Sequence, residues 1–436
     1  MSRDNFNKNK MIEFLYSVGL FGFGFFVTLH DLPRIPLLGF DVRIGILFFP
    51  LILCGLFCVK KNNFFESLKQ NYLIWITAFA LLTYCALNAA LVNPTMRGFG
   101  FLLWLIINVS VFFLIVLKPS KALVNGFLFT LVLNSGTILI QHYFYDLIWI
   151  PSKLSDFIFI TDLVRVYGLF GEPSYAGLNL SFLYLFLIFY DFSNYKKLNI
   201  LLKAAVVLAL FFTYSRTSLI VLLILFPLDF YLCFKKSFKK ALVTSSLFIG
   251  SFLISAINSS DFYPYMNIKI EKLVRVNASE YFKAQRNFNP PNEGLPESLL
   301  FAEYGSQNSR ILALQRGWVV FRQNSLFGVG LGNSKKYIFE NKILPHRFIE
   351  FFGLNNLFIE ILAELGLAGM SVFLFFVGSI FYKGIKTGAV VPVGMMFFIL
   401  FVLMQVFQNI NMPAMWMSFY FVLVSCSPSN TYKKSF

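Results

Sequence analysis

The chain has 436 residues, of which 57% are hydrophobic and 13% are charged, and its formal net charge is +16. So few charged residues cannot cover the surface of a water-soluble protein of this length, and the composition excludes that class. Apolar runs of about 18 residues or more recur along nearly the whole chain, each long enough to cross the hydrocarbon layer as a helix. The predicted fold class is an all-α polytopic membrane protein.

The first apolar run follows a basic N-terminal start and lacks a small-x-small cleavage site, so it predicts an uncleaved membrane helix. We predict about twelve membrane helices, at about 11–29, 37–58, 71–92, 98–117, 122–147, 174–191, 198–214, 217–234, 241–257, 355–381, 389–408 and 411–427. The predicted organisation is a membrane domain at 1–257 with helices 1–9, a large loop at 258–354, and helices 10–12 with a tail at 355–436.

The distribution of lysine and arginine predicts the orientation of these helices. With a cytoplasmic N-terminus, lysine-rich segments such as "NYKKLNILLK" and "KKSFKK" fall on the inner side. Cytoplasmic loops are rich in basic residues, and long translocated loops are exempt from that rule. Both termini are therefore predicted to be cytoplasmic and the large loop periplasmic. Since the basic residues are split across two faces of a membrane, nucleic acid is not an expected partner.

The sixth predicted helix begins with "GLFGEPS", in which Glu172 precedes Pro173. Proline suits a first helical turn, and an acid there is stabilised by the helix dipole. The alternative is that Glu172 points into an outward cavity as an acid or base. Arg165 and Arg216 fall on the same predicted side, and Arg216 interrupts a long apolar stretch. An ionisable residue at that depth marks a substrate path or a paired structural charge, unless it snorkels to the surface.

Within the large loop, residues 307–323 predict an amphipathic helix. Its predicted apolar stripe is Ile311, Leu314, Trp318 and Phe321, and its arginines are Arg310, Arg316 and Arg322. Such a helix suits the lipid headgroup region, but a loop helix packed on its own domain has the same pattern. "FGVGLGNSKKY" follows without the strand–helix context of a dinucleotide site, so a glycine turn that lets the backbone approach a ligand or lipid is the better interpretation.

The tenth predicted helix carries Asn356, Glu360 and Glu364 at four-residue intervals, which places them on one face. Carboxylates there are costly unless they face polar surroundings, so they either serve a site or pair structurally with arginines. Gly366 and Gly369 are predicted to permit close helix packing. The five cysteines lie in or beside apolar runs and the three histidines are scattered, so neither disulfides nor a metal site are expected.

Arginines and a few carboxylates around an outward cavity suit a lipid diphosphate. Arginines would hold the diphosphate and stabilise its leaving charge, and a carboxylate would take the proton from an attacking hydroxyl. No metal or other cofactor is needed for that reaction.

With its predicted architecture and its motifs "GLFGEPS", "YSRTS", "SRILALQRGW" leading to "GVGLG", and "NNLFIEILAELGLAG", the chain resembles the O-antigen polymerase and O-antigen ligase superfamily of bacterial inner-membrane glycan enzymes. Ligases of that superfamily carry His-Asn, nine further residues and Gly-x-x-Gly. Here Asn355 stands at the place of the histidine that is usually taken as the ligase's base. This departure favours a Wzy-type polysaccharide polymerase over a ligase.

The resemblance implies that undecaprenyl-diphosphate-linked oligosaccharide is polymerised into O-antigen or capsular polysaccharide at the periplasmic face of the inner membrane. Membrane lipid and a chain-length regulator protein are the further partners. By resemblance, Arg216 and Arg310 contact diphosphate or saccharide, and Asn355 takes the ligase histidine's place.

The residues themselves add four members to the predicted site. Arg165 and Asn356 join the substrate-binding set, Glu172 is the leading candidate for the base, and Glu360 is the second. The alternatives are an O-antigen ligase of the same superfamily and a transporter or flippase of lipid-linked sugars.

Overall fold

The computed structural model describes residues 3–26, 35–37, 40–42, 44–58, 61–118, 120–143, 168–169, 173–189, 196–213, 215–257, 306–341, 354, 356–389, 391–396 and 413–426. The helices with named bounds are α1 (Arg3–Phe26), α2 (Phe49–Leu53), α3 (Lys61–Gln70), α4 (Tyr72–Leu91), α5 (Met96–Leu117), α6 (Ala122–Tyr143), α8 (Pro173–Phe189), α9 (Lys196–Phe212), α10 (Arg216–Lys236), α11 (Phe238–Ile257), α15 (Ser306–Gln323), α16 (Ser334–Glu340), α17 (Leu357–Lys386) and α19 (Pro413–Ser425).

The prediction of a helical membrane protein is confirmed. Five of the described helical segments are long and apolar enough to cross a membrane, namely Tyr72–Leu91, Met96–Leu117, Ala122–Tyr143, Phe238–Ser255 and Leu357–Lys386. Shorter apolar segments lie in α8, α9 and α19. The count of twelve helices and the assignment of inner and outer sides remain predictions.

The helix predicted at 37–58 is wrong as a single element. Strands β1 (Ile35–Leu37) and β2 (Phe40–Val42) pair in antiparallel fashion. They are followed by the 3-10 turns η1 (Ile44–Phe48) and η2 (Cys54–Cys58), with the short helix α2 between them. The physical reason is proline, which lacks a backbone N–H: Pro36 lies in β1, and Pro50 restarts the helix in the first turn of α2.

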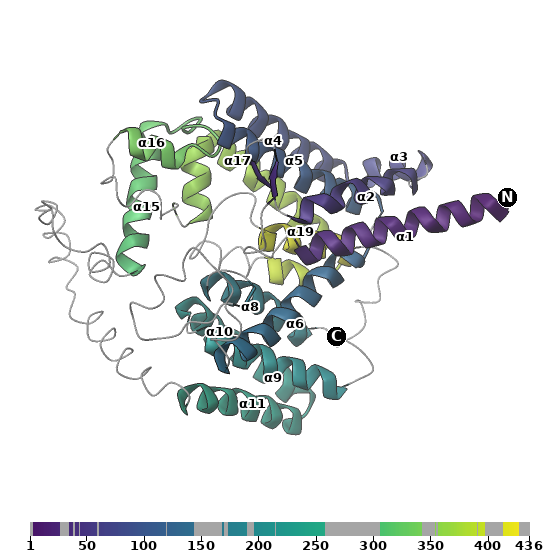
Figure 1. Cartoon of the computed structure of the whole chain (residues 1–436), viewed down its shortest axis with the longest axis vertical. Coiled ribbons are helices and arrows are strands. Elements are labelled where there is room, and N and C mark those ends of the chain that lie inside the picture. Colours follow the sequence, from purple (N-terminus) through teal and green to yellow (C-terminus); the bar gives the residue numbers. More distant parts are fainter. Residues whose placement is uncertain are drawn as a thin grey trace, which may run out of the picture.

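The helices pack in two groups (Figure 1). In one group α17 lies against α4, and α4 lies against α5. In the other, α8, α9, α10 and α11 pack on one another, and α6 joins them through α8 and α9. The helix α15 lies at the edge of the first group, beside the beginning of α17. The start of α17 is thus covered by a second helix.

An aromatic core fixes α17 to its neighbours. The ring of Phe376 in α17 lies 5.3 Å from Phe112 in α5 and 5.9 Å from Trp416 in α19, measured between ring centroids. Trp416 is fully buried, and the hydroxyl of Tyr420 donates to the carbonyl of Asn108 at 2.9 Å. Tilted and edge-on aromatic pairs of this kind add to the burial of apolar area. The rest of α17 is therefore firmly held while its first turns meet α15.

Candidate active site

Helix α17 is broken at Gly366, which adopts a left-handed φ of 68° with ψ of −168°. Only glycine takes this conformation without strain, and a Cβ there would collide with the carbonyl of Leu326. The sequence predicts that Gly366 and Gly369 both serve close helix packing. Gly369 does face Tyr84 of α4, whereas Gly366 ends one helical segment and begins another.

The turn between α15 and α16 fills this break. In a continuous helix Leu367 and Ala368 would donate to the carbonyls of Ala363 and Glu364. Four bonds to the turn replace those two bonds: Leu367 N to Ser325 O (2.8 Å), Ala368 N to Leu326 O (3.1 Å), Val329 N to Ala363 O (2.9 Å) and Gly330 N to Glu364 O (3.0 Å). The glycine turn therefore approaches the backbone of α17 closely, and the backbone groups freed by the break are paired.

Two side chains of α4 complete this pairing. The hydroxyl of Tyr84 donates to the carbonyl of Leu365 at 2.6 Å. One turn further along α4, the amide of Asn88 donates to the carbonyl of Phe327 and accepts from the N–H of Leu331, each at 2.8 Å. Irregular backbone at membrane depth is tolerated only where neighbouring groups satisfy it. The break in α17 is thus stabilised by specific hydrogen bonds from α4 and the glycine turn.

The break also sets the depth of the first turns of α17. The segment from Leu367 to Lys386 rises about 30 Å at 1.5 Å per residue, which by itself matches the hydrocarbon thickness of a bilayer. Its far end carries Lys383 and Lys386, as expected at a cytoplasmic boundary. The short segment before the break, with Glu360 and Glu364, therefore falls at the opposite, predicted outer boundary.

Glu364 is buried and fully engaged. Its carboxylate accepts from the N–H of Gly332 at 2.8 Å, from the hydroxyl of Ser334 at 2.7 Å and from the N–H of Ser334 at 3.4 Å. Hydrogen bonds donated to a carboxylate favour its charged form. These bonds occupy the carboxyl group of Glu364 and fix the turn before α16.

Glu360 lies one turn earlier on the same face and differs in one respect. Its side chain is only 8% exposed, yet Oε2 has no hydrogen-bond partner among the described residues. A buried carboxyl oxygen without a partner is costly and calls for an explanation. An oxygen left open in this way can accept a proton, or a hydrogen bond donated by a hydroxyl group, from a bound molecule.

Two cations complete the cluster. Lys335 is half-buried near the start of α16, and Arg97 is exposed near the start of α5 with its guanidinium 5.5 Å above the ring of Phe101. Burial lowers the pKa of Lys335 most, the positive charge of Arg97 lowers it further, and the two glutamates oppose the shift. The charges of Arg97, Glu360 and Glu364 therefore all act on Lys335, and we treat the four ionisable groups as one cluster.

Of the predicted site residues, the structure brings Glu360 and Asn356 to this place. Asn356 is the N-cap of α17, and its Oδ1 accepts from the N–H groups of Phe358 and Ile359 at 3.1 and 3.0 Å. An asparagine cap satisfies donors that a helix start leaves free. A role of Asn356 in binding substrate remains a prediction.

The other predicted site residues are described only in part or not at all. Arg216 begins α10 and Arg310 belongs to α15, but their side chains lie outside the described part of the structure. Glu172, Arg165 and Asn355 lie outside the described residues altogether. The shared hollow predicted for the three arginines is therefore untested.

Sequence reasoning missed Lys335, Arg97 and the distinct role of Glu364. Lys335 stands in the "NSKKY" that follows the glycine turn, and Arg97 lies between the helices predicted at 71–92 and 98–117, on the same predicted outer side as Arg165 and Arg216. That shared side was the available signal for Arg97. The signal for Lys335 was weaker, because only the fold brings α16 to the face of α17 that carries the glutamates.

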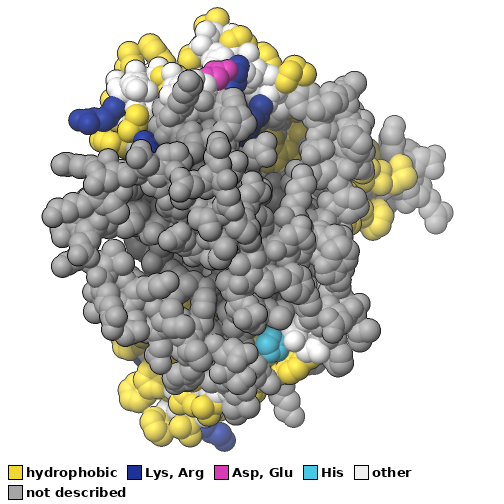
Figure 2. Space-filling model, turned by 60° about the vertical axis from the view of Figure 1, so that its left-hand side comes forward, with side chains coloured by type: hydrophobic (Ala, Val, Ile, Leu, Met, Phe, Trp, Pro, Cys, Tyr) yellow, Lys and Arg dark blue, Asp and Glu magenta, His cyan; other side chains and the backbone are white. Residues whose placement is uncertain are grey.

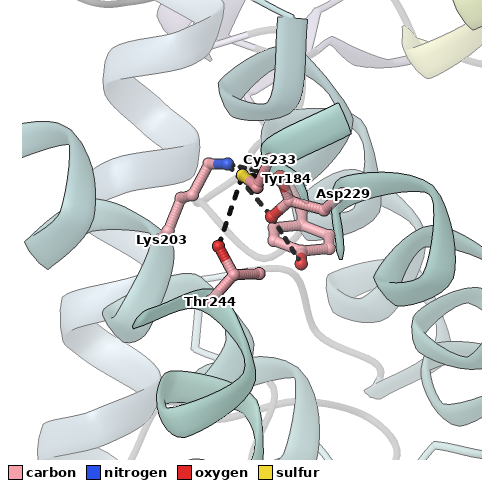
Figure 3. A network of polar contacts seen from close by, with 5 residues as sticks. All are labelled: Tyr184, Lys203, Asp229, Cys233 and Thr244. Atoms are coloured by element: carbon pink, nitrogen blue, oxygen red, sulfur yellow. Dashed lines mark hydrogen bonds and ion pairs between the residues drawn. The ribbon is translucent and has the colours of Figure 1, made fainter. Parts of the chain in front are cut away.

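A second buried charged cluster lies in the other helix group (Figure 3). Lys203 of α9 binds both carboxylate oxygens of Asp229 in α10, at 2.7 and 3.0 Å. Tyr184 of α8 donates to Asp229 Oδ2 at 3.1 Å, and the Cys233 thiol, which receives a bond from Thr244 of α11, donates to Oδ1 at 3.6 Å. These contacts join four helices.

Part of the chain matches a known protein family. Residues 201–374 match a family described as O-antigen ligase, a range that includes the Lys203–Asp229 pair, the glycine turn and both glutamates of α17. No curated protein matches the chain. Members of the family are glycosyltransferase-like enzymes that act on lipid-linked sugars in the membrane. The match does not separate a polymerase from a ligase, but it supports a relationship of residues 201–374 to the O-antigen ligase and polymerase superfamily.

Proposed function

We propose that the protein is a polysaccharide polymerase that joins undecaprenyl-diphosphate-linked repeat units into O-antigen or capsular polysaccharide at the periplasmic face of the bacterial inner membrane. The observation that carries the proposal is the buried Glu360, whose Oε2 has no hydrogen-bond partner among the described residues. It lies beside Lys335 and Arg97, and its neighbour Glu364 is already engaged.

In the proposed reaction, a hydroxyl of the acceptor repeat unit attacks the anomeric carbon of the donor saccharide. The bond between that carbon and the diphosphate oxygen breaks, and its electron pair leaves with undecaprenyl diphosphate. The hydroxyl proton passes to Glu360, whose open oxygen would accept the hydrogen bond that precedes the transfer. The reaction requires neither a metal nor another cofactor.

The cations of the site would stabilise the charge that develops on the leaving diphosphate. Lys335 and Arg97 are near enough to influence the charge state of the glutamates. A single site could therefore hold the base together with the cations that stabilise the leaving group. Arg165, Arg216 and Arg310 remain predicted partners of diphosphate or saccharide. Glu172 remains a predicted base, but Glu360 takes precedence in this proposal because its surroundings are described.

The broken helix bears on the transporter alternative. Transporters that use broken helices place the break and the substrate near the bilayer midplane. The break at Gly366 lies about 30 Å from the lysine-bearing end of α17, close to one membrane face. This favours chemistry at a single surface over passage through the membrane. A ligase of the same superfamily would use the same surface, and only the fate of the product distinguishes it.

The experiment that tests the proposal measures the length distribution of surface polysaccharide in a deletion strain. Loss of a polymerase leaves single repeats capped on the outer lipid. Loss of a ligase abolishes capping and leaves long chains on the carrier, and loss of a flippase leaves the precursor on the cytoplasmic side. Either of the last two outcomes would reject the polymerase assignment. Restoration of long chains by the wild-type chain, but not by Glu360→Gln, would support Glu360 as the base.

A further inference from the structure

Helix α15 buries a face of small residues against the start of α17. Ala313, Gly317 and Val320 are buried, and a Cβ on Gly317 would collide with the side chain of Ile359. This close approach explains why the middle of α15 holds a glycine. The predicted stripe of Ile311, Leu314, Trp318 and Phe321 is therefore not a single face: Phe321 is buried, whereas Leu314 and Trp318 are exposed, and the side chain of Ile311 is not described.

The outward face of α15 carries both apolar and basic side chains. Leu314, Trp318 and Arg322 recur every four residues and are all exposed, with Trp318 at 47%. Leu326 and Phe327 follow in the turn and are exposed at 56% and 54%. Figure 2 brings this side of the molecule forward, and hydrophobic side chains lie there beside Lys and Arg side chains at the upper edge.

The depth of α15 follows from its contacts. The turn after it is bonded to α17 at the break, the predicted outer limit of the hydrocarbon layer. Gly317 meets Ile359, seven residues before the break and hence about 10 Å further out along the helix. Figure 1 shows α15 beside the beginning of α17. The end of α15 and the turn after it therefore lie at the predicted hydrocarbon boundary, and Trp318 lies about two turns further out, near the level of the headgroups.

The exposed apolar surface also continues into a membrane span. Leu367, the first residue of α17 after the break, is 49% exposed, and its N–H is bonded to Ser325 beside Leu326. Because α17 meets lipid at this level, the neighbouring exposed side chains of the turn meet the same medium. Arg316 adds a cation on α15: it is half-buried, and its Nε has no hydrogen-bond partner among the described residues.

We propose that the end of α15 and the turn after it contact the outer leaflet, with Leu326 and Phe327 inserted among lipid chains and with Trp318, Arg316 and Arg322 at the level of the phospholipid headgroups. Tryptophan and arginine at the level of the headgroups are the side chains that such a position favours. This assignment chooses between the two interpretations that the sequence leaves open for residues 307–323. It does not depend on the polymerase assignment, because it concerns only contact with lipid.

The test is tryptophan quenching by brominated phospholipids in nanodiscs that hold the full-length protein. The difference between the wild type and Trp318→Phe isolates the emission of Trp318. We expect shallow bromines to quench this emission about twofold more than bromines deep in the chains, since interfacial side chains insert about 5–10 Å. Aqueous iodide should quench it weakly. Trp416, which is fully buried in the aromatic core, provides the internal comparison through Trp416→Phe.

Strong iodide quenching of Trp318 without an effect of shallow bromines would overturn the proposal, because Trp318 would then face water. Insensitivity to both quenchers would also overturn it, because another part of the protein would then cover the helix. A second measurement covers the case in which Trp318→Phe does not fold. A bromine-dependent change in the fluorescence of a solvatochromic dye attached to Leu326→Cys, in a chain without its other cysteines, places the same surface in lipid or in water.

Discussion

Two buried charged clusters in this protein differ in how completely their hydrogen bonds are satisfied. Asp229 receives bonds from Lys203 on both oxygens and a further bond from Tyr184, and its side chain is only 1% exposed. At the start of α17, Glu364 is engaged in the same way, but Oε2 of its neighbour Glu360 is open among the described residues. The first cluster holds helices together, whereas the second keeps one acceptor available.

The surroundings of the two clusters support this distinction. Beside Lys203 and Asp229 there is a cavity of about 10 Å³, lined also by Val207 and Leu247, which has room for about one water molecule. No saccharide or diphosphate fits there. The cluster of Glu360 lies instead next to a glycine turn and an exposed arginine at the predicted outer boundary. Burial of charge therefore does not by itself single out a candidate site; the open acceptor near an exposed arginine is the feature that motivates the proposed one.

The largest expected effect is that of Glu360→Gln. If Glu360 takes the proton from the attacking hydroxyl, the change should lower the polymerisation rate by about 10²–10⁴-fold. The measurement is chain extension by purified protein with a lipid-linked repeat unit as substrate. Glu340→Gln is the matched control, because Glu340 is an exposed glutamate of α16 that pairs, among the described residues, with Lys336 at 3.7 Å. Equal activity of both variants would reject Glu360 as the base.

The next effect concerns the pair of Lys203 and Asp229. Removing one partner leaves an uncompensated buried charge, so Asp229→Ala and Lys203→Ala should each lower the free energy of unfolding by about 3–5 kcal/mol. The double variant should lose less than the sum of the two. Thermal unfolding in detergent measures this, and chain extension per folded molecule should stay near the wild-type value. A loss of activity without a loss of stability would assign this pair a role in the reaction.

Lys335 should give the polymerisation rate a dependence on alkaline pH. Burial and the nearby Arg97 lower the pKa of Lys335, so its ammonium group loses its proton at a lower pH than an ordinary lysine, while Glu360 and Glu364 limit the shift. If the ammonium group stabilises the leaving diphosphate, activity should fall as the pH rises through that lowered pKa. Lys335→Arg should keep activity to higher pH, because a guanidinium stays protonated. Lys336→Arg, at an exposed neighbour, should leave the profile unchanged.

The smallest effect separates two roles of Asn356. As an N-cap, it should contribute about 1 kcal/mol to stability, and this is lost in Asn356→Ala and largely kept in Asn356→Asp. The free energy of unfolding and the rate of chain extension are measured for both variants. If Asn356→Asp retains stability but loses activity, the amide also contacts substrate, as the sequence predicts. If activity follows stability in both variants, Asn356 serves only as a cap.

The elements that the sequence predicts well are those set by local pattern. Apolar length alone places α4 and α5, and the four-residue spacing of Glu360 and Glu364 places both on one buried face. Prolines make a helix prediction from hydropathy unreliable, because hydropathy takes no account of a missing backbone N–H. The predicted helix at 37–58 is replaced by a strand hairpin and short helical turns.

The candidate site was predictable only in part, because its remaining features depend on tertiary contacts. Gly366 suggests close packing, but its left-handed conformation depends on bonds to a turn some forty residues earlier in the chain. The approach of Lys335 and Arg97 to Glu360 likewise depends on how α16 and α5 meet α17. No spacing along the chain encodes such contacts.

The exchange of hydrogen bonds at Gly366 has a consequence for biogenesis. The amides of Leu367 and Ala368 have their partners in residues 325 and 326, and the carbonyl of Leu365 has its partner in Tyr84. During synthesis those partners emerge from the ribosome before α17 does. The last part of this bundle can therefore reach its final form only on a surface assembled earlier, and a deletion that removes the turn would leave unpaired peptide groups at the lipid boundary. Translation from the N-terminus thus produces the glycine turn and α4 before α17, whose broken backbone they pair.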